Sequence, residues 1–161
     1  MKKYLSMILF VLIMGVVSVT VLVGADLITK DLIAKNSEYI WKNAVLTHHD
    51  IEHTQANFSE IFDENLTTLE EEDTQNNQVV YLYKDEETGR QSFRFRGNGL
   101  WDVIEGVLTL EEDFKTIVGI TVTKQGETPG LGGVVAEKAY LDKYVGKVFD
   151  IDKGIEVIKS P

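Results

Sequence analysis

The sequence predicts an α+β fold, and three observations lead to this class. A long uncharged apolar run occupies the amino end, apolar residues at helical spacing follow it, and from about residue 78 the pattern changes to the alternation of strands. Because the predicted helices and strands are segregated along the chain, we expect a transmembrane helix and then a mixed, mainly antiparallel sheet with flanking helices.

Residues 1–25 are predicted to be a transmembrane anchor. The run LSMILFVLIMGVVSVTVLVGA carries no charge, and a helix of this length crosses a hydrocarbon core of about 30 Å. Lys2 and Lys3 precede it, so the amino end is expected in the cytoplasm and the remainder outside the inner (plasma) membrane. A signal peptide cleaved after Ala25 is the alternative, although its apolar region is usually shorter.

Two regions are expected between the anchor and the sheet. Residues 26–46 predict an amphipathic helix that continues directly from the membrane, because their apolar side chains recur at helical spacing. These side chains are Leu32, Ile33, Ile40, Trp41, Ala44 and Val45. Residues 47–77 are polar and poorly patterned, which indicates a connecting region with an exposed loop at EEEDTQNNQ.

Residues 78–161 are expected to form the sheet domain. The segments QVVYLYK (78–84) and QSFRFRG (91–97) alternate as strands do, and DEETG supplies a turn between them. Residues 102–113 and 114–125 predict a second hairpin with an acidic turn. A short helix is expected over 134–145 and a last strand over 154–161, which would leave the fold incomplete at its carboxyl end.

Composition excludes several classes of function. The 161 residues suffice for one globular domain. Acidic residues number 26 against 16 basic ones, for a net charge of −10, and such a surface repels phosphate backbones, so nucleic acid is not an expected partner. The absence of cysteine excludes disulfides, thiol catalysis and Cys-ligated clusters.

All three histidines lie in the segment HHDIEH (48–53). On a helix, His49 and His53 at i and i+4 would face one metal, but the acid is displaced from the H-E-x-x-H pattern and no third ligand is evident. We therefore expect a solvated loop here and no metal site.

The segment GETPGLGG (126–133) concentrates four glycines and a proline at one point. Pro129 suits the second position of a tight turn, and Gly130 can take positive φ after it. Gly132 and Gly133 have no side chain to hold a ligand away from the backbone, and Leu131 offers an apolar surface to a flat ring. A plain turn between a strand and a helix explains the same composition, so both interpretations remain open at this point.

The motif GNGLW (97–101), a hairpin, and then the motif ETPGLGG (127–133) occur in that order. This arrangement resembles the FMN-binding domain family, in particular the C subunits of sodium-translocating NADH:quinone reductases and, more distantly, the G subunits of Rnf electron-transport complexes. The resemblance implies an extracytoplasmic FMN subunit that relays electrons in an ion-translocating NADH:quinone or ferredoxin:NAD oxidoreductase complex. Its partners would be the other membrane subunits, and it would not be an enzyme on its own.

The resemblance also implies which residues meet the flavin. They are Leu100, Trp101, Glu127, Thr128, Gly130 and Leu131. The family attaches FMN through its phosphate to a threonine in a Ser-Gly-Ala-Thr segment, and no such segment occurs up to Pro161. The expectation is therefore an FMN site without an attachment threonine in this chain. The alternative is a flavin-free binding or assembly module that keeps the fold.

Overall fold

The computed structural model describes residues 2–73 and 78–148, so the strand predicted over 154–161 lies outside the described residues. The chain divides into two compact units, Met1–Glu38 and Tyr39–Pro161, which are described separately.

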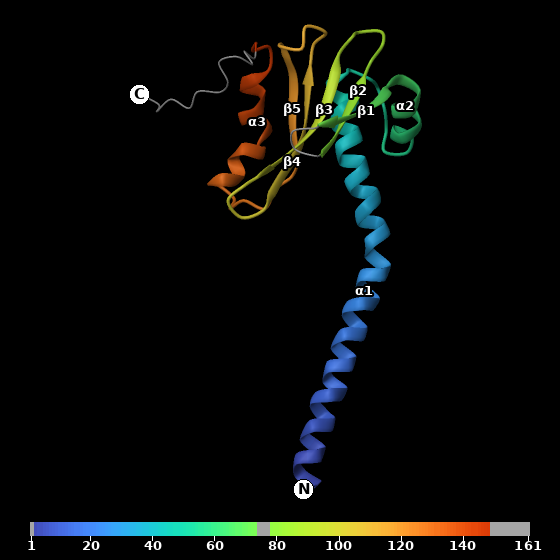
Figure 1. The fold of residues 1–161 in the computed structure, drawn as a ribbon, viewed down its shortest axis with the longest axis vertical. Helices are drawn as coiled ribbons and strands as arrows, with labels where there is room; N and C mark the ends of the chain where they lie inside the picture. Colours follow the sequence, from blue (N-terminus) through green and yellow to red (C-terminus); the bar gives the residue numbers. More distant parts are fainter. Residues whose placement is uncertain (1, 74–77, 149–161) are drawn as a thin grey trace. The chain divides into compact units, whose positions relative to one another are not determined.

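The first unit is most of one helix, α1, which spans Lys2–His48 (Figure 1), and residues 39–48 of this helix belong to the second unit. Its apolar portion is long and apolar enough to cross a membrane, and no residue of its most apolar 18-residue stretch is buried in protein. The hydroxyl of Thr20 donates to the Val16 carbonyl oxygen at 2.8 Å, which satisfies a polar group inside the helix itself. The sequence predicted that the helix of the apolar run continues directly into the next helical segment, and the unbroken α1 confirms this.

The second unit is built on a five-stranded sheet in the order β1-β2-β3-β4-β5 (Figure 1). The strands are β1 (Thr67–Asp73), β2 (Gln78–Lys84), β3 (Gln91–Asn98), β4 (Val103–Leu110) and β5 (Ile117–Lys124). Every pairing between the described strands is antiparallel, so the α+β class with flanking helices is confirmed, and the described part of the sheet is antiparallel throughout.

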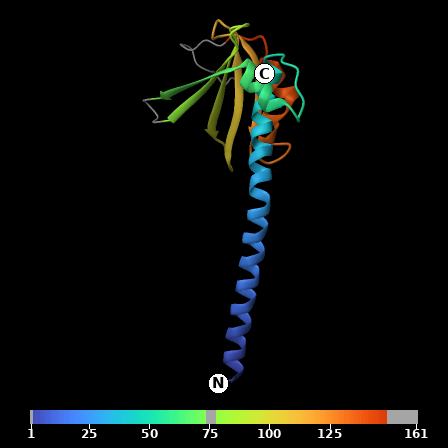
Figure 2. The same ribbon diagram turned by 90° about the vertical axis from the view of Figure 1, so that its right-hand side faces the viewer.

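The helical elements gather on one face of this sheet (Figure 2). Besides the last turns of α1, they are α2 (Phe58–Asn65), the 3-10 turn η1 (Gly132–Ala136), α3 (Lys138–Leu141) and the 3-10 turn η2 (Asp142–Tyr144). The helix predicted over 134–145 is thus broken into three short pieces. Glu137 has extended backbone angles (φ −73°, ψ 129°), and this conformation separates η1 from α3.

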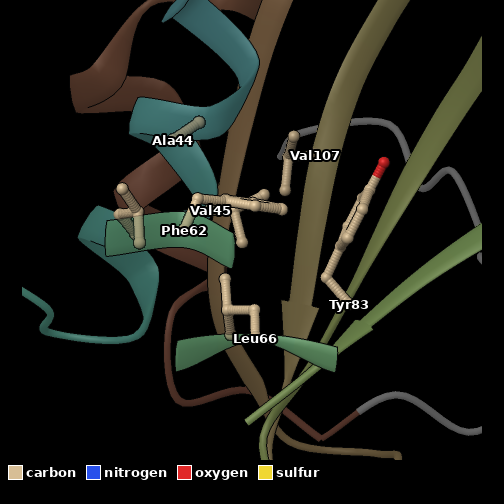
Figure 3. Close-up of a cluster of buried hydrophobic side chains, with 7 residues drawn as sticks. Ala44, Val45, Phe62, Leu66, Tyr83 and Val107 are labelled. Carbon is tan, nitrogen blue, oxygen red and sulfur yellow. The ribbon is translucent and has the colours of Figure 1, made fainter. Parts of the chain in front are cut away.

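The core forms where α1 and α2 meet the sheet (Figure 3). Val45 and Val107 are fully buried, and the ring of Phe62 lies edge-on to that of Tyr83 with 5.2 Å between centroids. The Trp41 ring stacks on Tyr83 at 5.3 Å. Burial of such side chains contributes roughly 1.5–3 kcal/mol each, so these contacts hold α1 to the sheet.

The region 47–77, predicted to be an unpatterned connection, contains two regular elements. Helix α2 buries Phe62, and β1 pairs with β2 over its whole length. The prediction failed because local propensity in an acidic segment is weak and the neighbouring strand supplies the hydrogen-bond partners.

Candidate functional site

Two loops meet at one end of the sheet because of the strand order. Strands β3 and β5 both pair antiparallel with β4, so they run in the same direction and end at the same edge. The loop after β3 (99–102, here the GLWD loop) and the loop after β5 (125–133, here the ETPG loop) therefore emerge side by side. All six residues that the resemblance assigns to the flavin lie in these two loops.

The Glu127 side chain joins the two loops. Its Oε1 accepts hydrogen bonds from the backbone N–H groups of Leu100, at 2.8 Å, and of Trp101, at 3.0 Å. The backbone N–H of Glu127 itself donates to Oε1 of Gln125 at 2.6 Å. Only 8% of Glu127 is exposed, so this carboxylate lies inside the junction of the loops.

Two glycines leave room for that carboxylate. A Cβ added at Gly99 would collide with Oε1 of Glu127, and a Cβ at Gly132 would lie 2.9 Å from its Oε2. Each position therefore requires a residue without a side chain. The motif GNGLW contained Gly99, but the space around it is limited both by Glu127 of the other loop and by the Asp102 carbonyl of its own loop, 2.7 Å from such a Cβ.

The ETPG loop forms the tight turn that its composition predicts. The N–H of Leu131 donates to the Thr128 carbonyl at 3.1 Å, Pro129 occupies the second position, and Gly130 follows with φ +74°. These are the features of a type II turn, so the predicted positive φ at Gly130 is confirmed. The N–H of Gly133 also donates to the Thr128 carbonyl, at 3.0 Å, which leads the chain into η1.

Large apolar side chains stand exposed around this junction. Leu100 is 81% exposed, Trp101 72% and Leu131 76%. Thr128 and Gly130 are exposed as well, whereas Glu127 is not. Exposed apolar side chains that gather at one place are typical of binding surfaces, which makes this junction the candidate site.

The histidine segment is not the solvated loop that the sequence predicted. Helix α1 continues to His48, and His49 follows directly after its end, so that both side chains reach the sheet. His48 forms hydrogen bonds to the hydroxyls of Thr109 (2.8 Å) and Thr121 (2.9 Å), and buried His49 bonds to Ser92 (2.8 Å). The prediction failed because a polar segment indicates a solvated loop unless its buried partners on distant strands are known.

Burial keeps these two histidines neutral at ordinary pH. Loss of solvent lowers the pKa of His48 from 6.5 to about 4, with smaller contributions from His49 and Lys138. Burial also lowers the pKa of His49, and nearby Asp85 opposes that effect. Among the described residues, no three His, Asp or Glu side chains are placed to hold a metal, and the expectation of no metal at His49 and His53 stays a prediction.

Comparison with known proteins connects the loop junction with flavin proteins. Residues 99–159 match the FMN-binding domain family. The C subunit of the Na(+)-translocating NADH-quinone reductase of Neisseria meningitidis is 46% identical over 74 residues, which are 44% of this chain and 29% of that protein. Its counterpart in Vibrio alginolyticus is 38% identical over 89 residues, 53% of this chain and 35% of that protein. The matched part therefore spans about a third of the length of these relatives.

Solved structures share the fold. The crystal structure of Shewanella oneidensis NqrC superposes with a TM-score of 0.64 at 22% identity, covering 80% of this chain and 79% of that one. The corresponding reductase protein from Parabacteroides distasonis gives a TM-score of 0.57 at 17% identity and covers 71% and 67%. The α+β arrangement and the resemblance on which the flavin residues were assigned are both confirmed, while the role of each of those residues stays a prediction.

Proposed function

We propose that this chain, which resembles the C subunits of the sodium-translocating NADH:quinone reductases and carries a match to the FMN-binding domain family, is a membrane-anchored extracytoplasmic FMN subunit. It would relay electrons within an ion-translocating NADH:quinone or ferredoxin:NAD oxidoreductase complex. One structural observation carries the proposal beyond the resemblance. The GLWD and ETPG loops, joined through Glu127 at one end of the sheet, carry Leu100, Trp101 and Leu131 with their side chains exposed.

The chemistry of these residues fits the isoalloxazine ring. Trp101, Leu100 and Leu131 offer apolar area against which a flat ring packs. Thr128 supplies a hydroxyl, and Gly130 places an exposed backbone beside it without a side chain in the way. When bound, FMN supplies the electron-accepting chemistry, and the protein supplies position and the local electrostatics that tune it.

The membrane part of the proposal rests on α1. Its uncharged run follows Lys2 and Lys3, and this charge arrangement supports a cytoplasmic amino end with the sheet domain outside. A protein anchored in this way would have the other membrane subunits of an Nqr- or Rnf-like complex as its partners. Both the orientation and the partners are inferences from the charge pattern and from the named relatives.

The experiment is a titration of the full chain, in detergent micelles, with free FMN, followed by quenching of flavin fluorescence. Without the attachment threonine, free FMN is expected to bind weakly but saturably, and about tenfold or more weaker still in Trp101→Ala and in Leu131→Ala, because each removes about 1.5 kcal/mol or more of apolar contact. Phe114→Asn is the matched control. Phe114 is also exposed, but it lies in the turn at the opposite end of β4 and β5.

Two results would contradict the proposal. A folded protein that does not bind FMN would leave the flavin-free binding or assembly module as the better description. Equal losses in the two loop variants and in Phe114→Asn would show that binding does not depend on the junction of the loops.

A further inference from the structure

Glu127 differs from the other five residues that the resemblance assigns to the flavin. It is buried at 8% exposure, whereas Leu100, Trp101 and Leu131 are each more than 70% exposed. Its Oε1 is already engaged by two backbone N–H groups of the GLWD loop. A buried carboxylate with these partners binds backbone N–H groups of the protein itself.

We propose that Glu127 is a positioning residue that clamps the GLWD loop to the ETPG loop, so that Trp101 and Leu131 present one continuous apolar surface. The ligand named for that surface rests on the proposed function, but the clamp itself rests only on contacts within this chain. Its carboxylate fixes the backbone from which Leu100 and Trp101 project, and it does not serve as a flavin ligand.

The energetics favour a carboxylate for this task. A hydrogen bond to an ionised acceptor is about twice as strong as a neutral one, and Glu127 accepts two at one oxygen. The N–H of Gly99 donates to the Asp102 carbonyl at 2.9 Å, which closes the GLWD loop into a turn and aims the next two N–H groups in a common direction. Adjacent N–H groups so arranged form an anion-binding concavity.

Neighbouring residues of the ETPG loop hold Glu127 itself in place. Gln125 accepts from the Glu127 backbone N–H at 2.6 Å, and Gly132 leaves space at Oε2. An ion pair beside the loop junction is weaker. Lys124 and Asp102 form an ion pair at 3.8 Å with both side chains about half exposed, and such surface pairs contribute little to stability.

The first test is amide hydrogen exchange, measured by NMR on the full chain in micelles without FMN. In Glu127→Ala, exchange at the Leu100 and Trp101 amides should accelerate about tenfold or more, since their acceptor is gone. Amides in the paired strands β3 and β4 should keep their wild-type rates, which shows that the fold is intact.

Three further variants sharpen this test. Gly99→Ala should accelerate the same two amides, because its Cβ would press on the Glu127 carboxylate and on the Asp102 carbonyl of its own loop. Glu127→Gln keeps an acceptor oxygen and should have a smaller effect. Lys124→Ala, which removes only the exposed ion pair, is the matched control and should leave both amides protected.

The second test is the FMN titration described above. Glu127→Ala should weaken FMN binding about tenfold while both apolar side chains remain present, because a mobile loop must be ordered on binding. Loss of affinity should then track amide exchange across Glu127→Gln, Gly99→Ala and Glu127→Ala.

The outcomes separate the two proposals. Unchanged exchange at Leu100 and Trp101 in Glu127→Ala would overturn the clamp. Weakened FMN binding with wild-type exchange would also overturn it, since Glu127 would then contact the flavin directly. If the wild-type protein binds no FMN but Glu127→Ala exposes the two amides, the clamp stands and the proposed function fails.

Discussion

The His48 ring links one helix to two strands through a single side chain. Both ring nitrogens are within hydrogen-bond distance of hydroxyls, Nδ1 with Thr109 on β4 and Nε2 with Thr121 on β5. Thr109 continues the chain of contacts to the Ser92 hydroxyl at 2.6 Å, and Ser92 meets His49. A neutral imidazole suits this setting, because protonation would bring a charge into a partly dehydrated site.

Stability should therefore depend on pH through His48. The unfolded chain binds this proton near pH 6.5 and the folded chain only near pH 4. The stability contributed by neutral His48 is thus fully present above pH 6.5, falls as the pH is lowered, and is lost below about pH 4. We expect the free energy of unfolding of the full chain in micelles, measured with urea, to fall by on the order of 3 kcal/mol through this group as the pH drops from above 6.5 to about 4.

His48→Asn isolates this contribution. The variant should be less stable than wild type at neutral pH, and its stability should fall less steeply between pH 6.5 and about 4, with His49 and the carboxylates still titrating. Parallel pH profiles for the two proteins would contradict the assignment.

At the scale of elements, the end of α1 approaches β5 at Gly119. A Cβ on Gly119 would lie 2.6 Å from the His48 ring, closer than packed atoms come. The Arg90 guanidinium strengthens the same junction, because Nη1 donates to the His48 carbonyl at 3.2 Å and pairs with Asp50 at 2.7 Å. The helix end is thus satisfied by a side chain from the loop that precedes β3.

Substitution at Gly119 should loosen this junction. Gly119→Ala is expected to destabilise the protein by about 1–3 kcal/mol, because the ring or the strand must move. Gly97→Ala, on β3, is the matched control, since a Cβ there meets nothing within 4 Å. Thermal unfolding of both variants measures the difference, and equal midpoints would show that the His48 contact is not tight.

At the scale of the whole molecule, an apolar helix precedes an acidic sheet domain. The helix meets the criteria of length and hydropathy for a span, and the named relatives belong to a sodium-translocating reductase. Membrane association fits both facts, whereas the direction of crossing depends on the two lysines alone.

Protease treatment of intact spheroplasts tests that direction. We expect digestion of the sheet domain from outside, with an amino-terminal fragment that stays with the membrane. Protection of the domain would reverse the orientation. Amino-terminal sequencing that begins at Asp26 would replace the anchor with a cleaved signal peptide.

The sequence alone predicted the features that depend on the pattern of neighbouring residues. The period change near residue 78 placed β2 to β5 within a few residues of their observed bounds. Pro129-Gly130 likewise predicted its own turn, because φ preferences are local. The pattern did not predict β1, α2 or the burial of His48 and His49, since each depends on a partner from a distant strand or helix.

The sequence by itself determined an apolar helix, an α+β domain and a glycine-rich loop with a positive φ at Gly130. Periodicity and backbone preference act between neighbouring residues, so they can be inferred without the fold. Only the tertiary structure decided that Glu127 turns inward to the Leu100 and Trp101 amides while Leu131 turns outward. That choice depends on β4 pairing with both β3 and β5, which brings two loops far apart in the sequence within hydrogen-bond distance.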